Sequence, residues 1–226
     1  MLPEWNELPE EMKNDYVLRY YNVLKEKENS LRIKRAFDIV MSSIMIVLLL
    51  PVFVIIAIMI KRDSEGEVFY KQTRVTTGNR DFTIYKFRTM VSGADKIGPK
   101  VTVGSDMRVT AVGEKLRKYR LDELPQLFNV LKGDMSFVGT RPEVRKYVDA
   151  YTPSMMATLL LPAGITSLAS IKYKDEATLL ENAVDADDVY IRKILPEKMK
   201  YNLKSLRRFS CMSDLATMIY TVISVL

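Results

Sequence analysis

The sequence predicts an α+β protein that is mainly helical, in which an apolar membrane segment, a β-hairpin and amphipathic interfacial helices surround a compact domain. Three observations support this fold class: a run of 22 uncharged residues from Ile39 to Ile60, two β-prone stretches around a glycine turn, and helical periodicity through much of the remainder. At 226 residues the chain is long enough to bury a core in one domain.

Composition narrows the chemistry that this chain can perform. It has 34 Lys and Arg against 28 Asp and Glu, giving a net charge of +6, which suits nucleic acid, an anionic membrane or phosphorylated substrates. The absence of histidine excludes imidazole bases, Ser-His-Asp triads and histidine-bearing metal sites. A single cysteine, Cys211, excludes an internal disulfide and a thiolate zinc site. Carboxylates with a hard, oxygen-bound cation are the simplest remaining scheme.

The N-terminal part divides into a polar arm, residues 1–31, and an apolar segment, residues 32–62. The arm predicts a surface or interfacial amphipathic helix, with Tyr16 and Leu24 among the apolar positions. The apolar run has the length of a membrane-crossing helix, but Pro51 lies inside it and basic residues flank both ends. A spanning helix and a re-entrant helix-break-helix, with both ends on one side of the membrane, both remain open on this evidence.

The remaining residues, 63–226, predict one compact domain. The β-prone stretches are 68–75 and 82–87, joined by a turn at 76–80, and a loop follows at 92–106. Helices are expected at 112–131, with a break or new cap near 121–125, and at 150–160, 175–183, 195–206 and 214–226. The helix at 195–206 is basic and amphipathic, as helices that lie on membrane surfaces often are, and the last helix is too short to span a bilayer.

The adjacent carboxylates Asp122 and Glu123 are the central candidates for chemistry. Two neighbouring carboxylates can share one Mg²⁺, or one can act as nucleophile while the other assists. Pro125 suits the first turn of a helix, which would place the pair at the positive end of that helix. A solvated helix cap would explain an isolated pair equally well.

Basic residues around this pair favour a phosphate site. Lys86 and Arg88 are two apart on a predicted strand and therefore face the same side. Arg117 and Arg120 precede the acidic pair, and Arg141 follows a Gly139-Thr140 turn. Arginine suits bidentate phosphate contacts, so this cluster is harder to explain as solvated surface than any one of its members.

Four motifs in this order resemble the bacterial sugar transferase family, the small monotopic phosphoglycosyl transferases. They are Lys34-Arg35-Ala36-Phe37-Asp38, Val68-Phe69-Tyr70-Lys71-Gln72 with Arg74, Tyr85-Lys86-Phe87-Arg88-Thr89-Met90, and the unbroken stretch from Leu121 to Pro142. The resemblance covers about residues 32–222. The chain departs from the family pattern at Thr140, where proline is common, at Ser167-Leu168, where Gly-Trp is frequent, and at Thr76, where glycine is expected.

The resemblance implies a role for each matching residue. Asp122 falls on the aspartate nucleophile and would also bind Mg²⁺, and Glu123 falls on the second acid, which assists the metal or the acceptor. The substrate-binding positions implied are Lys86, Arg88, Arg117, Gln126, Arg141, Pro142 and Asp188. Pro51 falls on the break of a re-entrant membrane helix, which favours the re-entrant alternative over the spanning one.

The implied activity is transfer of a sugar-1-phosphate from a UDP-sugar to polyprenyl (undecaprenyl) phosphate, through a covalent aspartyl-phosphosugar, with release of UMP. It is the first membrane step of surface polysaccharide or glycoconjugate assembly, on the cytoplasmic face of the bacterial inner membrane. Membrane phospholipid is an implied partner and nucleic acid is not. Neither the sugar nor the oligomeric state follows from the sequence.

Two alternatives to this expectation remain open. The chain could be a membrane-anchored binding protein without chemistry, or a one-step transferase in which Asp122 is only a metal ligand.

Overall fold

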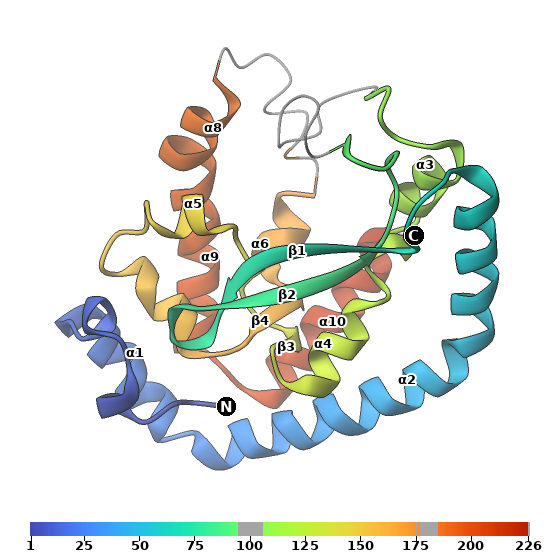
Figure 1. Ribbon diagram of the computed structural model, residues 1–226. Helices are drawn as coiled ribbons and strands as arrows, with labels where there is room; N and C mark the ends of the chain where they lie inside the picture. Colours follow the sequence, from blue (N-terminus) through green and yellow to red (C-terminus); the bar gives the residue numbers. More distant parts are fainter. Residues whose placement is uncertain (95–105, 175, 177–184, 226) are drawn as a thin grey trace.

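The computed structural model describes residues 1–94, 106–174, 176 and 185–225. It confirms a mainly helical chain with small β-sheets and one long apolar helix near the N-terminus (Figure 1). The longer helices are α1 (Asp15–Lys25), α2 (Glu28–Asp63), α3 (Ala111–Lys118), α4 (Gln126–Lys132), α9 (Leu195–Arg207) and α10 (Cys211–Val225). Most of the predicted loop at 92–106, and most of the predicted helix at 175–183, lie outside the described residues.

Helix α2 contains the apolar run and continues without interruption past Pro51. The predicted helix-break-helix is therefore a bend within one helix, because a proline removes a single hydrogen bond while those on either side persist. Figure 1 shows α2 running beneath the rest of the chain and then turning up along its side. By length and composition α2 could cross a membrane. Within the apolar run the exposed side chains are all apolar: Ile39, Val40, Ile44, Val47, Leu48, Leu50, Pro51, Val54, Ile55, Ile58 and Met59.

Both halves of α2 are attached to the remainder of the chain. In the first half, the buried Lys34 ammonium donates to the Asp214 carboxylate at 2.5 Å and to the Val138 carbonyl at 2.9 Å. In the second half, Phe53 and Ile60 pack in a buried cluster with Phe87. The basic flank before the apolar run therefore contacts protein groups.

The predicted hairpin is confirmed as β1 (Phe69–Thr76) and β2 (Arg80–Phe87), antiparallel, with Phe69 opposite Phe87. Gly78 lies in the turn with φ of 66°, a conformation that glycine adopts without strain. Thr76, where glycine was expected, needs no such freedom because its φ is −134°. Its hydroxyl donates to the Asp134 carbonyl at 2.6 Å and accepts from the Ala163 amide at 3.2 Å, which ties the hairpin to the second sheet.

That second sheet, absent from the sequence-based prediction, pairs β3 (Met135–Val138) with β4 (Ala163–Thr166) in parallel. The sequence did not predict these strands because both are short and because Pro162-Ala163-Gly164, at the start of β4, is typical of a turn. Gly139 and Gly164 bring the two backbones together. A Cβ atom on Gly164 would lie 2.1 Å from the Gly139 nitrogen, so only glycine fits there.

The N-terminal arm packs into the core. Its side chains Met12, Val17 and Leu24 are fully buried in a cluster that also contains Leu160 of the 3₁₀ helix η6 (Met155–Leu160) and Leu206 of α9. The apolar face of α9 is consequently covered by protein, which corrects its assignment as an interfacial helix. Helix α10 instead exposes apolar side chains: Met212, Leu215, Ile219, Tyr220, Val222 and Ile223.

The close approach of the two parallel strands predicts a stability effect. We expect Gly164→Ala to lower the free energy of unfolding by about 2 kcal/mol, because the added methyl group meets backbone atoms that cannot move aside. Gly78→Asn is the control, since Gly78 has open space and asparagine tolerates the left-handed conformation. Thermal unfolding in detergent micelles measures both variants, and an equal or smaller shift for Gly164→Ala would contradict the strand packing.

Candidate active site

The acidic pair lies on a short 3₁₀ helix, η5 (Leu121–Glu123), between α3 and α4. Arg120 begins this turn with φ of 55°, and Pro125 immediately precedes α4, as the sequence predicted. Leu121 and Leu124 pack against the cluster around Phe53 of α2. The apolar anchors on both sides of the pair thus fix the acidic turn beside the second half of α2.

Glu123 is held by two cations from different parts of the chain. Its Oε1 accepts from Lys86 Nζ of β2 at 3.0 Å and from Arg141 Nη2, in the loop after β3, at 2.6 Å. Arg141 Nη1 approaches Oε2 at 3.4 Å. Burial alone would raise the pKa of Glu123, but the charges of Arg141 and Lys86 outweigh it and hold that pKa far below its ordinary value. Glu123 is therefore ionised, and its Oε1 accepts a short hydrogen bond from each of these two partners.

Asp122, the neighbouring acid, has a different environment. Its side chain is buried, and its Oδ1 makes no hydrogen bond to any described residue. Burial raises the pKa of Asp122, the charge of Glu123 raises it further, and Lys86 and Arg117 oppose the shift. A buried carboxylate oxygen without a partner is costly unless a ligand or water completes it, so Asp122 is the acid that remains available for chemistry.

The three cations of the site differ in their hydrogen-bond partners and in their exposure. Burial, together with the charge of Arg141, lowers the pKa of Lys86, whereas its partner Glu123 raises it. Arg117 on α3 donates through Nε to the Thr89 hydroxyl at 2.9 Å, and the charge of Asp122 acts on it. The side chain of Arg141 is 31% exposed although it pairs with Glu123, so it can also contact a ligand.

Two predicted substrate-binding residues, Arg88 and Gln126, make no hydrogen bond to the acidic pair in the described part of the chain. Arg88 donates to the carbonyls of Glu65 and Ser64, at 2.8 and 2.7 Å, and so fastens the end of α2 to β2. Gln126 lies one turn after Asp122 and is fully buried, and neither of its amide atoms has a hydrogen-bond partner among the described residues. Their roles toward substrate stay predictions.

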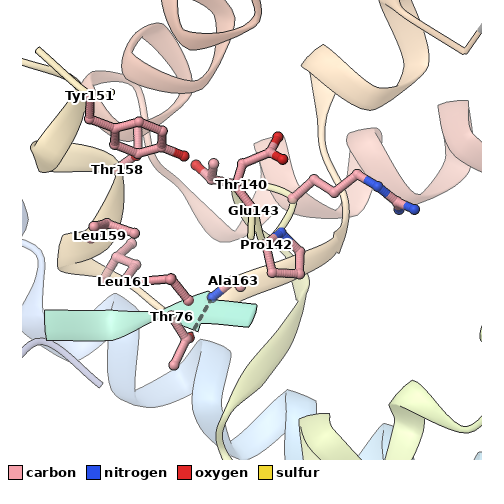
Figure 2. A pocket seen from close by; sticks show the side chains of 11 residues that line it. Thr76, Thr140, Pro142, Glu143, Tyr151, Thr158, Leu159, Leu161 and Ala163 are labelled. Carbon is pink, nitrogen blue, oxygen red and sulfur yellow. Dashed lines mark hydrogen bonds between the residues drawn. The ribbon is translucent and has the colours of Figure 1, made fainter. Parts of the chain in front are cut away.

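The structure places Pro142 beside Arg141, at a small cavity of about 10 Å³ that has room for about one water molecule (Figure 2). Asp188 lies apart from the acidic pair. It is exposed on α8 (Ala186–Val189), at the top of Figure 1, and pairs with Arg192 at 2.6 Å.

Arg74 was not among the predicted site residues, although it belongs to the second matching motif. It donates from β1 to the Pro142 carbonyl at 3.1 Å and to the Gln72 side chain at 2.8 Å. Burial lowers the pKa of Arg74, whereas the charge of Glu143 raises it. The sequence feature that could have identified Arg74 is a charged residue within an otherwise β-prone stretch.

The side chains at the acidic pair can be compared with the ligands that Mg²⁺ prefers in proteins. No group of three or more acidic or thiol side chains suited to a metal occurs among the described residues. Mg²⁺ is commonly held by one or two carboxylates together with substrate phosphates and waters, so Asp122 with its unpaired oxygen fits such a site. Oε1 of Glu123 already accepts hydrogen bonds from two cations, whereas the nearest donor to its Oε2 is Arg141 Nη1 at 3.4 Å.

Comparison with known proteins places the chain in a family. The family model described as bacterial sugar transferase matches residues 29–226. The chain is 40% identical over 197 residues to a UDP-N-acetylgalactosamine-undecaprenyl-phosphate N-acetylgalactosaminephosphotransferase of Aeromonas hydrophila, covering 86% of this chain and 44% of that protein. It is 34% identical over 195 residues to a UDP-glucose:undecaprenyl-phosphate glucose-1-phosphate transferase of Klebsiella pneumoniae, covering 84% and 39%.

A third relative is an undecaprenyl-phosphate galactose phosphotransferase of Salmonella typhimurium, 34% identical over 191 residues, with coverage of 78% of this chain and 40% of that protein. The chain thus spans less than half the length of these three relatives. The matched residues include the acidic turn, both cations that hold Glu123 and the whole of α2 except its first residue. From this match, the chain belongs to the bacterial sugar transferase family.

Proposed function

We propose that this chain transfers a sugar-1-phosphate from a UDP-sugar to a polyprenyl phosphate, with Asp122 as the nucleophile. The difference between the two adjacent acids carries the proposal: Glu123 is fixed by Lys86 and Arg141, whereas Asp122 has a buried oxygen without a partner. The three relatives are named for undecaprenyl phosphate as acceptor, and two of them for a UDP-sugar as donor.

The reaction proceeds in two displacements. A carboxylate oxygen of Asp122 attacks the β-phosphorus of the UDP-sugar, and the bond from that phosphorus to the bridging oxygen breaks, so that UMP leaves with the bridging oxygen. In the second displacement a phosphate oxygen of the polyprenyl phosphate attacks the same phosphorus and releases the Asp122 carboxylate. A covalent intermediate lets one site accept a soluble donor and a membrane-bound acceptor in turn.

The charged residues around Asp122 support this chemistry. Phosphoryl transfer depends mainly on positioning and on neutralising the oxygens of the transferring group. Arg141 is partly exposed and Arg117 is electrostatically coupled to Asp122, so both are suited to the diphosphate. Glu123 serves chiefly to hold Lys86 and Arg141 in place.

Mg²⁺ would bind at Asp122 together with phosphate oxygens of the donor, and would supply further charge neutralisation to the leaving UMP. Glu123 is the weaker candidate ligand, because its charge is already compensated by Lys86 and Arg141 and only its Oε2 lacks a short hydrogen bond.

We further propose that α2 enters one leaflet and returns, so that both of its ends lie on the cytoplasmic face of the inner membrane. The exposed apolar side chains of α2, the proline inside it and the curve of the helix in Figure 1 favour this arrangement. The acidic turn packs against the second half of α2, which would hold it where the acceptor head group lies. The product would enter surface polysaccharide or glycoconjugate assembly.

The first prediction concerns Asp122. Purified protein mixed with a radiolabelled UDP-sugar, without lipid, should retain label and release UMP. UDP-N-acetylgalactosamine, UDP-glucose and UDP-galactose are the donors to test. Asp122→Asn should reduce label retention on the order of a thousandfold, because the nucleophilic oxygen is lost. Asp15→Asn, exposed on α1, is the matched control. Turnover with lipid but no retained label would favour a one-step transfer, and neither signal with any donor would favour a binding protein.

The second prediction concerns pH. A protonated carboxyl is a poor nucleophile, so label retention falls as pH drops through the raised pKa of Asp122, which lies above the ordinary value of 3.8. Glu123→Gln should move this acid limb to lower pH, because one negative charge that raises the pKa is removed. Arg117→Gln should move it to higher pH, because a charge that lowers the pKa is removed. Shifts of the same sign in both variants would show that another group controls the limb.

The third prediction concerns membrane topology. In a Cys211→Ser background, Asn29→Cys and Glu67→Cys place thiols at exposed positions before and after the apolar part of α2. Both thiols should react with a membrane-impermeant maleimide only when the cytoplasmic face is accessible. Labelling from opposite faces would show that α2 spans the bilayer.

A further inference from the structure

The loop that carries Arg141 is fixed by the backbone at both of its ends. The Gly139 amide donates to the Thr166 carbonyl at 3.0 Å, and the Gly164 amide donates to the Thr140 carbonyl at 2.8 Å. After the loop, the Val75 amide of β1 donates to the Glu143 carbonyl at 3.0 Å. Arg141 lies between these attachments, so its reach toward Glu123 depends on how firmly they hold.

The side chain of Glu143 begins a buried polar chain that leads away from the acidic pair. Its Oε1 accepts from the Tyr190 hydroxyl at 2.6 Å, and that hydroxyl accepts from Lys198 Nζ at 2.9 Å. Lys198 Nζ is also 3.6 Å from Glu143 Oε1 and donates to Glu176 at 2.9 Å. Tyr190 begins a π-helical turn, η7 (Tyr190–Ile194), and Lys198 lies on α9.

All three members of this chain are buried: Glu143, Tyr190 and Lys198 are 6%, 5% and 3% exposed. A buried carboxylate is costly without compensating charge and hydrogen bonds, so Tyr190 and Lys198 stabilise Glu143 in its position. Burial and the adjacent charge of Glu143 raise the pKa of Tyr190 far above its ordinary value, which keeps the hydroxyl protonated as a donor.

The loop also borders the small cavity described above. The small cavity is lined by Thr140, Arg141 and Glu143 together with Tyr151 and Thr158 of the neighbouring segment, and Figure 2 shows the Tyr151 hydroxyl pointing towards Thr140. If Glu143 were released, this part of the loop would have beside it a cavity with room for about one water molecule.

We infer that Glu143, Tyr190 and Lys198 are positioning residues that hold the Arg141 loop in the geometry needed at Glu123. The inference rests on the proposed function for the role of Arg141. The buried chain reaches from helix α9 to the loop beside the acidic pair, so residues remote in sequence set the position of a phosphate-binding cation. None of the three needs to touch the substrate.

Tyr190→Phe tests the inference, because it removes one hydroxyl and keeps the ring. We expect kcat/KM for label retention from the UDP-sugar to fall by about tenfold, as misplacement of a binding group by a fraction of an ångström commonly produces. Tyr147→Phe is the matched control. The ring of Tyr147 packs on Tyr190 at 4.6 Å between centroids, but its hydroxyl donates to Asp187, away from the loop.

A double-mutant cycle separates positioning from general loosening of the fold. If Tyr190 acts through Arg141, adding Tyr190→Phe to an Arg141→Ala variant should lower kcat/KM by less than about twofold. A tenfold loss in both backgrounds, an equal loss in Tyr147→Phe, or no loss in Tyr190→Phe would overturn the inference.

Hydrogen exchange at Val75 tests the same inference without any activity. The Val75 amide reports on the Glu143 carbonyl, so its exchange should accelerate by about tenfold in Tyr190→Phe and stay unchanged in Tyr147→Phe. Unchanged exchange in Tyr190→Phe would overturn the positioning role. Failure of the wild-type protein to retain label from any donor would count against the proposed function only, because the exchange result stands by itself.

Discussion

The ion pairs at Glu123 are the interaction on which the candidate active site depends. They join β2, the acidic turn and the loop after β3 through a single buried carboxylate. Loss of either cation would remove a charge-assisted hydrogen bond to this carboxylate in a region of low dielectric and leave the other cation as its partner. The arrangement therefore fixes three segments relative to one another and leaves the neighbouring Asp122 as the acid without a committed partner.

Helix α2 also supports the candidate active site. Its second half contributes Phe53, Ile56 and Ile60 to the cluster against which the acidic turn packs, and Arg88 fastens the end of the helix to the hairpin. The apolar exterior of α2 and the polar interior of the site are thus separated by one layer of buried side chains. A bend in α2 is compatible with this layer because the helix stays continuous through Pro51.

Local patterns in the sequence were enough to predict some of these features. The hairpin follows from alternation around a glycine turn, and the acidic pair with its cations follows from residue types close to matching motifs. Contacts between distant segments did not follow. The parallel pairing of β3 with β4 requires knowledge of which short strands meet, and the apolar face of α9 indicates burial without showing whether lipid or protein covers it. Likewise, Arg88 is indistinguishable in sequence from a phosphate ligand, although its donors bind backbone carbonyls.

The ion pair between Lys34 and Asp214 has a consequence for how the protein is made. The two residues are separated by 180 positions, yet their contact fastens α2 to α10. Contacts of such sequence separation form late, since the intervening chain must first be ordered and its closure entropy overcome. During synthesis, α2 emerges from the ribosome long before α10 exists, so its apolar surface must be received by the bilayer or a chaperone while its eventual protein partner is still untranslated.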